Sequence, residues 1–516
     1  MTSLTAAALL AADFATLPDL IRAQAMERGD AVAVADAAAR LSWAELDRMT
    51  DRIAARLQRA GVERGMRVAI AGMNSVEQVA VILGTLRAGA CAGLITNSAT
   101  GAQMAAMVRD TGARHLFLDA PAAAALADQD VGDVERIAMD GSAAGTALAR
   151  WLPADDARPA PVAITGDDEF NIIYSSGTTG TPKGIVHSHA MRWQHIMRGV
   201  PAYGPAAVTI LSTPLYSNTT MASFLPTLGS GGKVVLMPKF DARGFLELAE
   251  RERATNCMLV PVQYRRIMAL DDFDRFDLSS FVMKYCTSAP FPAALKADVL
   301  ARWPGGLVEI YGLTEGGGVC LLEAHKYPDK LHTVGQPSPG HDMRVIDEQG
   351  RELPPGSVGE IVGRSPAMMK GYNNRPDATR AMHWHDADGQ LFYRHGDIGR
   401  FDADGFLTLM DRAKDMIISG GFNIYPSDLE AILLADARVV EAAVVGMPSD
   451  EWGETPVAFV VLRDPNADIE AIRAACNAAV GKTQRLSAII AVDELPRSPI
   501  GKVLKRELRD AHAVKP

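Results

Sequence analysis

The residues best suited to chemistry lie in one short loop, residues 174–184, with the sequence Tyr-Ser-Ser-Gly-Thr-Thr-Gly-Thr-Pro-Lys-Gly. Glycines let backbone N–H groups turn toward one point, and hydroxyls add donors there, so the loop suits phosphate oxygens. It does not follow the Walker A pattern, since Gly184 rather than Ser or Thr follows Lys183. The alternative is a surface loop of small polar residues. The closing Pro182-Lys183-Gly184 favours the phosphate loop.

Two further clusters suit a nucleotide. In Glu309-Ile310-Tyr311-Gly312-Leu313-Thr314-Glu315, the aromatic ring can stack on a base, the threonine can reach a phosphate and the glutamate can bind Mg²⁺. Alone, this Thr-Glu pair could instead cap a helix. In Tyr393-Arg394-His395-Gly396-Asp397, the carboxylate can bridge two ribose hydroxyls, or it can be an ordinary turn aspartate.

The last two clusters lie near the C-terminus. One joins Asp411-Arg412-Ala413-Lys414-Asp415 to Ser419-Gly420-Gly421-Phe422, and the other is Pro499-Ile500-Gly501-Lys502. Taken singly, the first would be interpreted as a solvated linker with a turn, and the second as a C-terminal tail without a function.

The elements that must position these clusters alternate between helix and strand. Trp43–Ala60 has apolar residues at helical spacing, with Ser42 and Glu45 as a capping box. We expect a further helix at 77–88 and strands at 67–71, 91–95, 115–118, 170–174, 208–211, 233–237, 258–260 and 283–286. This alternation predicts an α/β fold with parallel sheets and crossover helices. Residues 120–166 have weak periodicity and predict a loose surface excursion.

The C-terminal part changes character. Short strands between Gly, Pro and Asp turns predict a β-rich subdomain at 335–410. A small α+β domain follows, with helices at 427–435 and 468–479 and strands at 439–445, 455–462 and 488–492. We therefore divide the chain into a large domain (1–410), a hinge (411–415) and a small domain (416–516).

Composition narrows the class of protein. A chain of 516 residues is too long for one core, and 48% hydrophobic with 22% charged residues is typical of a globular protein. The net charge of −10 argues against nucleic acid as a partner. The five cysteines form no CxxC pair, which predicts reduced thiols and a cytoplasmic location. There is no convincing signal peptide and no apolar run near the roughly 20 residues that cross a bilayer.

Histidine spacing gives little support for a metal centre. No HExxH is present, and the close pairs His187/His189 and His383/His385 lack an obvious third ligand. A structural or solvent-facing role for both pairs is favoured over zinc.

In this order and with these separations, the five clusters resemble the motifs of the adenylate-forming (ANL) superfamily of acyl-CoA synthetases, adenylation domains and luciferases. The resemblance extends from about residue 40 to residue 506. Through Asp415-Met416-Ile417-Ile418-Ser419-Gly420-Gly421 the chain is most similar to coumarate-, benzoate- and fatty-acid-CoA ligases. The resemblance implies a large domain of layered α/β sheets and a small mobile C-terminal domain.

The resemblance also implies a two-step reaction, in which a carboxylate and Mg·ATP give acyl-AMP and pyrophosphate, and the thiol of coenzyme A then releases AMP. It assigns the β- and γ-phosphates to Ser175, Ser176, Gly177, Thr178, Thr179, Gly180 and Lys183, and the α-phosphate and Mg²⁺ to Thr314 and Glu315. It assigns adenine to Tyr311 beside Ser288-Ala289-Pro290, the ribose to Asp397 with Arg412, and further nucleotide contacts to Glu309, Ile310 and Gly312.

The two half-reactions are expected to use different faces of the small domain. By resemblance, Lys502 bridges the carboxylate and the α-phosphate during adenylation, while Ser419, Gly420, Gly421 and Phe422 border the pantetheine of coenzyme A during the second step. One face cannot present both, so rotation about Lys414 in the hinge is implied.

The acyl pocket is less well defined. By resemblance its walls are Tyr216, Ser217, Asn218 and Thr219 on one side and Gly316, Gly317, Gly318 and Val319 on the other. Many relatives have histidine where Ser217 stands. The glycines indicate either room for a bulky acyl group or turn geometry. No Asp is placed to bind an α-amine, and neither wall segment holds Arg or Lys, which disfavours amino acids and dicarboxylates. An aryl or phenylpropenoic acid, or a fatty acid, remains.

Several functions share these motifs. An acid:CoA ligase is the first, and a ligase that passes acyl-AMP to a separate carrier protein is the second. A nucleotide-binding sensor without turnover and a luciferase-like oxygenase are the others. The expected partners are a carboxylic acid, ATP and coenzyme A, and a homodimer is compatible with the sequence.

Overall fold

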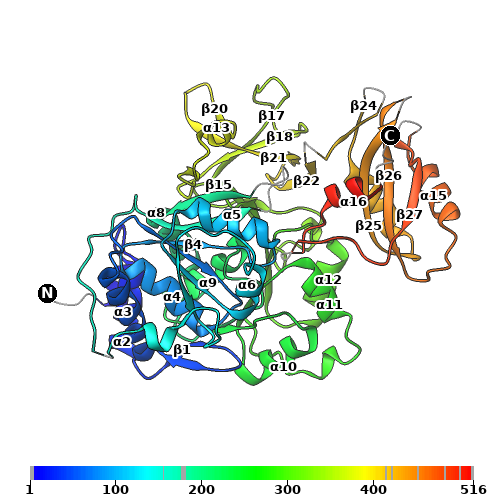
Figure 1. The fold of residues 1–516 in the computed structure, drawn as a ribbon. Helices are drawn as coiled ribbons and strands as arrows, with labels where there is room; N and C mark the ends of the chain where they lie inside the picture. The colour runs from blue at the N-terminus through cyan, green and yellow to red at the C-terminus, as the bar shows by residue number, and fades with distance from the viewer. Residues whose placement is uncertain are drawn as a thin grey trace.

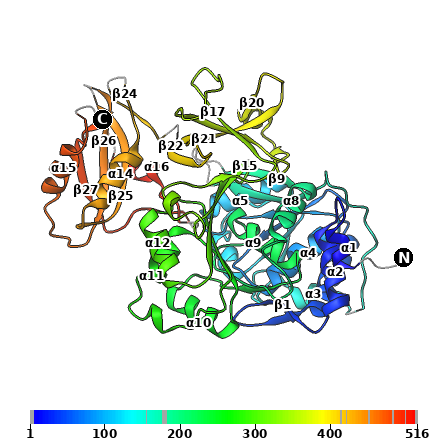
Figure 2. The same ribbon diagram turned by 180° about the vertical axis from the view of Figure 1, so that it is seen from behind.

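The computed structural model describes residues 5–154, 156–175, 182–412, 415–419, 422–449, 452–481, 484–498 and 501–512. Figures 1 and 2 show a large part, which runs from the N-terminus to the yellow segments, and a smaller orange-to-red part at its side. Within the described residues the strands form four sheets. Two of them build the body of the large part.

The first sheet contains the strands that lead into the Thr314-Glu315 cluster. Its strands are β1 (Val32–Ala35), β2 (Arg40–Ser42), β10 (Val208–Leu211), β11 (Lys233–Leu236), β12 (Asn256–Leu259), β13 (Met283–Thr287), β14 (Gly306–Leu313), β15 (Gly316–Glu323) and β16 (Gln336–Pro337). Their spatial order is β16-β15-β14-β13-β12-β10-β11-β1-β2. The central strands pair in parallel, and β2, β15 and β16 pair antiparallel at the edges.

The second sheet leads into the loop that begins at Ser175. Its strands are β3 (Arg67–Ala71), β4 (Cys91–Leu94), β5 (His115–Leu118), β6 (Glu135–Ala138), β7 (Thr146–Ala147), β8 (Glu169–Ser175), β9 (Lys183–Ser188) and β19 (Gly371–Tyr372). The order is β19-β9-β8-β4-β3-β5-β6-β7, with β9 and β19 antiparallel to their neighbours. The loop after β8 therefore connects β8 to its antiparallel neighbour β9, which lies between β8 and the edge strand β19.

Helices form layers around these sheets. The described helices of the large part are α1 (Ala6–Leu10), α2 (Leu17–Arg28), α3 (Trp43–Arg59), α4 (Val76–Arg87), α5 (Gly101–Thr111), α6 (Ala120–Ala125), α7 (Leu148–Trp151), α8 (His189–Gly199), α9 (Asn218–Gly229), α10 (Ala242–Glu252), α11 (Pro261–Met268), α12 (Ala293–Arg302) and α13 (Pro376–Arg380). One buried apolar cluster joins both sheets through α2, α3, α4 and α9. Separate clusters pack α10–α12 on the outer face of the first sheet and α5–α6 on that of the second.

The third sheet forms the β-rich part and packs against β15, near the β16 edge of the first sheet. It contains β17 (Asp342–Ile346), β18 (Gly359–Arg364), β20 (His383–His385), β21 (Leu391–Phe401) and β22 (Leu407–Arg412). Its order is β17-β18-β21-β20, with β22 paired to β21. Tyr311 on β14 packs into the apolar cluster of this sheet, so the two sheets share a boundary.

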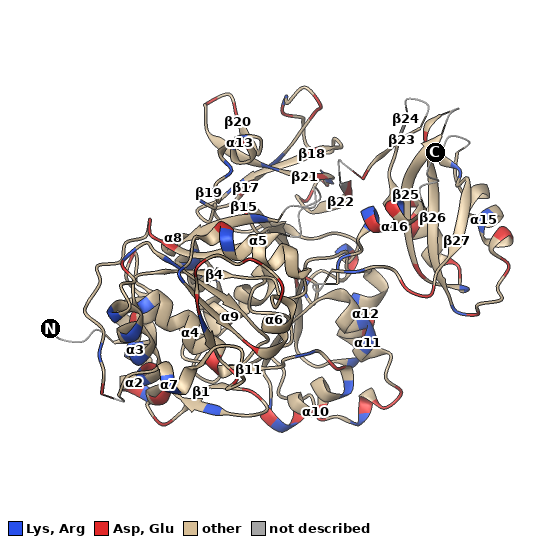
Figure 3. Cartoon of the chain, in the orientation of Figure 1, with Lys and Arg blue, Asp and Glu red and all other residues tan. Residues whose placement is uncertain are grey.

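The small part is an α+β unit with its own core. It contains β23 (Ile417–Ser419), β24 (Phe422–Ile424), α14 (Pro426–Ala435), β25 (Val439–Ser449), β26 (Gly453–Leu462), α15 (Ile469–Ala478), β27 (Ala488–Ala491) and α16 (Lys505–His512). Figure 3 shows basic and acidic residues interspersed along helices of both parts, such as α3 and α15. Within the described residues, no helix is long and apolar enough to cross a membrane.

The layered α/β fold with a β-rich part and a small α+β part is confirmed. The capping box of α3 is present: the Glu45 N–H donates to Ser42 Oγ at 3.3 Å, and the Ser42 N–H donates to Glu45 Oε2 at 2.8 Å. The loose excursion expected at 120–166 is wrong for much of its length, because β6 pairs in parallel with β5 and β7 extends the edge. Strands this short carry little periodicity, and the sheet edge supplies their partner.

Candidate active site

The expected site residues gather where parallel strands end. Strands β10, β12, β13 and β14 end at Leu211, Leu259, Thr287 and Leu313, and β8 ends at Ser175. In open α/β sheets, ligands bind at the carboxyl ends of the strands. Ser288 and Thr314 directly follow such ends, and the wall segment from Tyr216 follows β10.

Thr314 and Glu315 form the turn of the hairpin between β14 and β15, in which Leu313 lies opposite Gly316. The Tyr372 hydroxyl donates to Glu315 Oε1 at 2.6 Å, and Lys183 Nζ lies 5.1 Å from the centre of the Tyr372 ring. Tyr372 reaches this place because β19 pairs with β9, with Tyr372 opposite Ile185. The structure thus brings together the lysine of the first cluster and the glutamate of the second.

Tyr372 was not among the predicted site residues. Burial and the neighbouring Glu315 carboxylate raise the pKa of Tyr372, so its hydroxyl remains a donor across the physiological range. In the sequence, Tyr372 is marked only by the short segment Lys370-Gly371-Tyr372, of which Gly371–Tyr372 forms a two-residue strand. Pairing with β9 could not be inferred from so short a segment.

Replacing Tyr372 with phenylalanine should slow acyl-AMP formation by about tenfold, the effect expected when a hydrogen bond to a charged group is lost. The ring remains beside Lys183, so only the hold on Glu315 changes. Pyrophosphate release would measure the rate. Tyr327→Phe, at a partly exposed tyrosine that packs on Phe406, is the matched control. Equal rates for the two variants would contradict a positioning role.

Tyr311 and Asp397 lie in direct contact. The Tyr311 hydroxyl donates to Asp397 Oδ2 at 2.8 Å and lies 3.1 Å from His395 Nδ1. His395 Nε2 lies 2.8 Å from the carbonyl oxygen of Gly317, and burial lowers the pKa of His395. Asp397 on β21 stands opposite Arg412 on β22. Tyr311, expected at adenine, and Asp397, expected at the ribose, thus form one buried group with His395 next to the Thr314-Glu315 hairpin.

The turn at Ser288 joins the nucleotide side to the acyl side. Ser288 has a left-handed backbone, with φ of 83°, and its hydroxyl hydrogen-bonds the Thr219 hydroxyl. Ala289 is half-buried and Pro290 is exposed. Since Thr219 belongs to the expected acyl wall, the two predicted regions adjoin at this hydroxyl pair.

Other predicted nucleotide residues on β14 have a different setting. Glu309 is buried and forms an ion pair with Lys296 on α12, and burial raises its pKa to about 7. Ile310 is half-buried and packs against the main core, while Gly312 is exposed. The Glu309 carboxylate therefore serves the helix α12 contact rather than the Tyr311–Asp397 group.

The expected acyl walls differ in character. The Tyr216 hydroxyl donates to Ser98 Oγ at 3.3 Å, and Ser217 caps α9 by accepting from the Thr219 N–H at 3.2 Å. Gly316, Gly317 and Gly318 have φ of 86°, 80° and 107°, and a Cβ on Gly316 would lie 2.0 Å from the Ala367 carbonyl oxygen. Of the two explanations for these glycines, backbone geometry is the one that the structure favours. Val319 follows them half-buried on β15.

Some predicted residues lie outside the described part of the chain. These are Ser176, Gly177, Thr178, Thr179 and Gly180 of the loop, Lys414 of the hinge, and Gly420 and Gly421 of the coenzyme A segment. The side chains of Arg412 and Phe422 are likewise outside it. Ser419 is buried on β23 and pairs with Gly453. The roles expected for all of these remain predictions.

The loop that carries Lys502 is docked on the large part. Arg497 Nη1 donates to the Gly501 carbonyl at 2.8 Å, and a Cβ on Gly501 would lie 2.8 Å from Val262 Cγ1. Val262 lies in the first turn of α11, which follows the end of β12 at Leu259. Lys502 is thus held at the strand-end edge where the other predicted residues collect.

An ion-pair bridge accompanies this docking. Arg265 Nη1 on α11 lies 2.8 Å from Glu441 Oε1 on β25, and Arg497 Nη2 lies 3.0 Å from Glu441 Oε2. One carboxylate therefore joins the large part to the loop of the small part that carries Lys502.

Glu441→Gln should slow acyl-AMP formation by about three- to fivefold, since a partly exposed ion pair contributes up to about 1 kcal/mol. Thioester formation from supplied acyl-AMP should keep its rate if, as the sequence predicts for Lys502, the docked loop acts in the first half-reaction. Single-turnover assays of each half-reaction would measure both. Asp436→Asn, which removes an ion pair to Arg438 within the small part, is the control. Equal slowing of both half-reactions would contradict this assignment.

The residues present fit one hard cation beside the nucleotide. Mg²⁺ is usually bound by one or two carboxylates together with substrate phosphates. Glu315 is half-buried, one of its oxygens is held by Tyr372, and it keeps further lone pairs for a cation. Among the described residues, no group of three or more His, Cys, Asp or Glu is placed to hold a metal.

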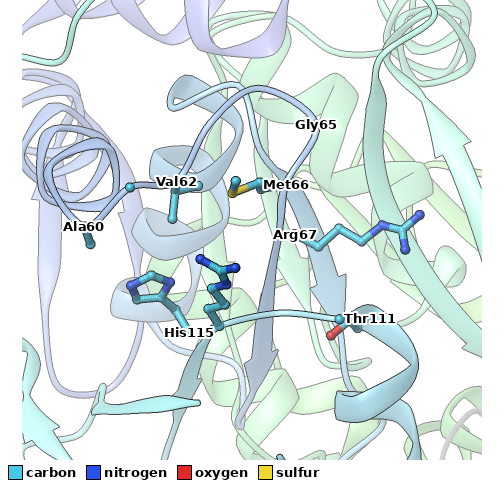
Figure 4. Close-up of a pocket in the computed structure, with 10 residues that line it drawn as sticks. Ala60, Val62, Gly65, Met66, Arg67, Thr111 and His115 are labelled. Carbon is cyan, nitrogen blue, oxygen red and sulfur yellow. The ribbon is translucent and has the colours of Figure 1, made fainter. Parts of the chain in front are cut away.

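A cavity of about 320 Å³ is lined by residues including Arg67, Arg114 and His115. Figure 4 shows the side chains of Arg67 and His115 in its wall. It lies where β3 and β5 begin and where α3 and α5 end. Because β3 and β5 are parallel, their amino ends lie at one edge of the second sheet and their carboxyl ends at the opposite edge. The cavity lies at the amino-end edge. The cavity is separate from the site described above.

Comparison with known proteins fits this geometry. The sequence model of the AMP-binding enzyme family matches residues 21–373, and that of the AMP-binding enzyme C-terminal domain matches residues 428–502. The chain is 30% identical to the long-chain-fatty-acid–CoA ligase FadD13 of Mycobacterium tuberculosis, over 92% of this chain and 93% of that protein. It is 33% identical to a feruloyl-CoA synthase of Amycolatopsis, over 93% and 95%.

A solved structure shows the same fold. The amide bond synthetase McbA of Marinactinospora thermotolerans superposes with a TM-score of 0.84 at 28% identity, covering 96% of this chain and 100% of that one. The family matches, the two relatives and this superposition span both parts of the molecule. The chain therefore belongs to the AMP-binding enzyme family, within the adenylate-forming superfamily of acyl-CoA ligases.

Proposed function

We propose that this enzyme is an ATP-dependent acid:CoA ligase that acts on an apolar monocarboxylic acid. The observation that carries the proposal is the meeting of Lys183, Tyr372 and Glu315 at the β14–β15 turn, beside the Tyr311–Asp397 pair. This group offers a cation, a carboxylate, an aromatic ring and a second carboxylate where strands end. Such a set suits a nucleotide triphosphate with its metal.

In the first half-reaction, a carboxylate oxygen of the acid attacks the α-phosphorus of ATP, and the bond to the bridging oxygen of pyrophosphate breaks. Lys183 faces the departing phosphates, and Thr314 and Glu315 face the α-phosphate. Mg²⁺, held by Glu315 and the phosphates, would offset their negative charge. Lys502 from the docked loop pairs with the carboxylate and the α-phosphate.

In the second half-reaction, the sulfur of coenzyme A attacks the acyl carbonyl carbon, the bond to the AMP oxygen breaks, and acyl-CoA and AMP leave. Ser419, Gly420, Gly421 and Phe422 line the approach of the pantetheine. The small domain (416–516) turns about the hinge at 411–415 between the steps. The support is the presence of Lys502 and Ser419 on separate segments of one small unit.

The acid is an aryl or phenylpropenoic acid, or a medium-to-long-chain fatty acid. The relatives support this range, because one is named for long-chain fatty acids and the other for ferulate. The similarity to an amide bond synthetase supports a second candidate, in which an amine rather than a thiol receives the acyl group. Transfer to a carrier protein is a third acceptor of the same acyl-AMP.

Release of AMP from Mg·ATP over a panel of carboxylic acids, with and without coenzyme A, tests the proposal. Release that depends on coenzyme A and on one acid class supports the ligase. Acyl-AMP that forms but is not consumed when coenzyme A is added points to an amine or carrier acceptor. ATP binding without turnover of any acid would overturn the proposal in favour of a sensor.

A further inference from the structure

Arg192 on α8 is a fully buried arginine in a cluster of neutral acceptors. Its Nε donates to Asn171 Oδ1 at 2.9 Å, and its Nη2 donates to His187 Nδ1 at 2.8 Å. Its Nη1 donates to His195 Nδ1 at 2.9 Å and to Asn218 Oδ1 at 2.7 Å. Among the described residues, no carboxylate forms an ion pair with it. Burying a charged guanidinium that has only neutral amide and imidazole partners costs free energy of folding, so a functional role would explain why this arginine is buried here.

The proton positions in the cluster follow from the arginine. Burial lowers the pKa of Arg192 to about 9, which leaves it charged at neutral pH. Burial and this charge hold the pKa of His187 and of His195 well below the ordinary value, so both rings are neutral. Because an arginine only donates, the Nδ1 atoms of His187 and His195 must accept through a lone pair, and the proton of each neutral ring is on Nε2. For His187, that Nε2–H donates to the carbonyl oxygen of Thr314 at 2.8 Å.

The same reasoning fixes the amide of Asn218. Its Oδ1 must face Arg192, so its NH₂ group points away from the arginine. Asn218 opens α9 between Ser217 and Thr219, and it is only half-buried although its neighbours are buried. Thr219 in turn bonds Ser288. One arginine thus reaches the proposed acyl wall through Asn218 and the phosphate turn through His187.

We propose that Arg192 is a positioning residue that holds the acid side and the phosphate side of the site in register, through Asn218 on one arm and the His187–Thr314 contact on the other. The inference rests on the proposed function, since it takes Asn218 as part of the acid side. Adenylation needs the carboxylate and the α-phosphorus in line, and misplacement of about 1 Å can cost about 100-fold in rate. A single rigid donor fork between the two walls supplies that alignment.

The two arms predict different kinetic effects. Asn218→Ala should raise the KM for the acid by about tenfold and leave the KM for ATP unchanged, since one hydrogen-bonding side chain on the acid side is lost. His187→Leu should lower kcat by about tenfold with an unchanged KM for the acid, because the Thr314 carbonyl loses its donor. His187→Gln, whose amide can still donate to Thr314, should recover part of kcat. Arg192→Lys should show both effects.

His195→Leu is the matched control. This histidine is buried like His187 and accepts from the same guanidinium, but the Thr314 carbonyl bonds His187 and not His195. A purely structural role for the cluster would make His187→Leu and His195→Leu alike. We expect His195→Leu to lower kcat less than His187→Leu does and to raise the KM for the acid less than Asn218→Ala does, because the His187–Thr314 contact and the Asn218 side chain both remain.

The experiment is steady-state pyrophosphate release by the full chain with 4-coumaric acid and with decanoic acid as probe acids, together with urea unfolding of each variant. Equal kcat for His187→Leu and His195→Leu, or an unchanged acid KM in Asn218→Ala, would overturn the inference. If Arg192→Lys does not fold, Asn218→Ala and His187→Gln carry the test, because each removes or alters one contact. A wild-type enzyme inactive with both acids would overturn the proposed acid class instead.

Discussion

Replacing Lys502 with alanine is expected to lower the rate of acyl-AMP formation by about 100-fold or more, the usual cost of removing a charge aimed at a developing anion. The loop that carries Lys502 lies against Val262 at the strand-end edge of the first sheet. Its ammonium would neutralise the carboxylate and the α-phosphate as they approach. Thioester formation from supplied acyl-AMP should keep its rate, because the bond between the α-phosphorus and pyrophosphate is already broken in that substrate.

Pyrophosphate exchange would measure the first half-reaction of Lys502→Ala, and release of AMP from synthetic acyl-AMP and coenzyme A the second. Arg506→Ala is the control, since Arg506 lies on α16, shortly after the Lys502 loop, and forms an exposed ion pair with Asp510. Similar losses in both half-reactions would show that Lys502 supports the fold or the docking rather than adenylation.

The sequence was informative wherever residue type alone restricts geometry. For Gly316, Gly317 and Gly318 the sequence narrowed the explanation to acyl room or turn geometry, and their positive φ values, which other residues avoid, favour turn geometry. The capping box at Ser42 and the largely buried strands β3 and β13 were predictable, because local hydrogen bonding and apolar runs define them.

Contacts between distant segments were not predictable. Tyr372 reaches Glu315 only because a two-residue strand pairs with β9, and Arg192 reaches Thr314 through a histidine from another element. Glu309 was expected near the nucleotide, yet its partner Lys296 lies on the helix that precedes its strand. A single sequence carries no signal for such pairings, because each depends on how sheets and helices pack.

The two wall segments illustrate the same limit. Neither contains Arg or Lys, so the sequence indicated an acid side without a cation. In the structure, Arg192 from α8 hydrogen-bonds Asn218 in one of those walls. Its other hydrogen bonds also go to neutral side chains, those of Asn171, His187 and His195. The proposed preference for a monocarboxylate therefore needs a different argument: the guanidinium next to this wall already makes four hydrogen bonds to protein groups.

Glu315→Ala is expected to slow acyl-AMP formation on the order of 100-fold, because the carboxylate is the described group best placed to share a cation with the phosphates. Tyr372 holds one of its oxygens at 2.6 Å, which leaves the other directed away from the tyrosine. Glu315→Gln keeps the shape and the acceptor but removes the charge. The concentration of Mg²⁺ needed for half-maximal rate should therefore rise in both variants.

Pyrophosphate exchange over a range of MgCl₂ concentrations would measure this effect. Glu323→Gln is the matched control, because Glu323 ends the same strand β15 and forms an exposed ion pair with Lys326. An unchanged Mg²⁺ requirement in Glu315→Gln would show that the metal is held elsewhere. Tyr372→Phe separates the remaining alternatives: if Tyr372 only orients a metal-binding carboxylate, combining it with Glu315→Ala should slow the reaction no more than Glu315→Ala alone, since the hydroxyl then has nothing left to position.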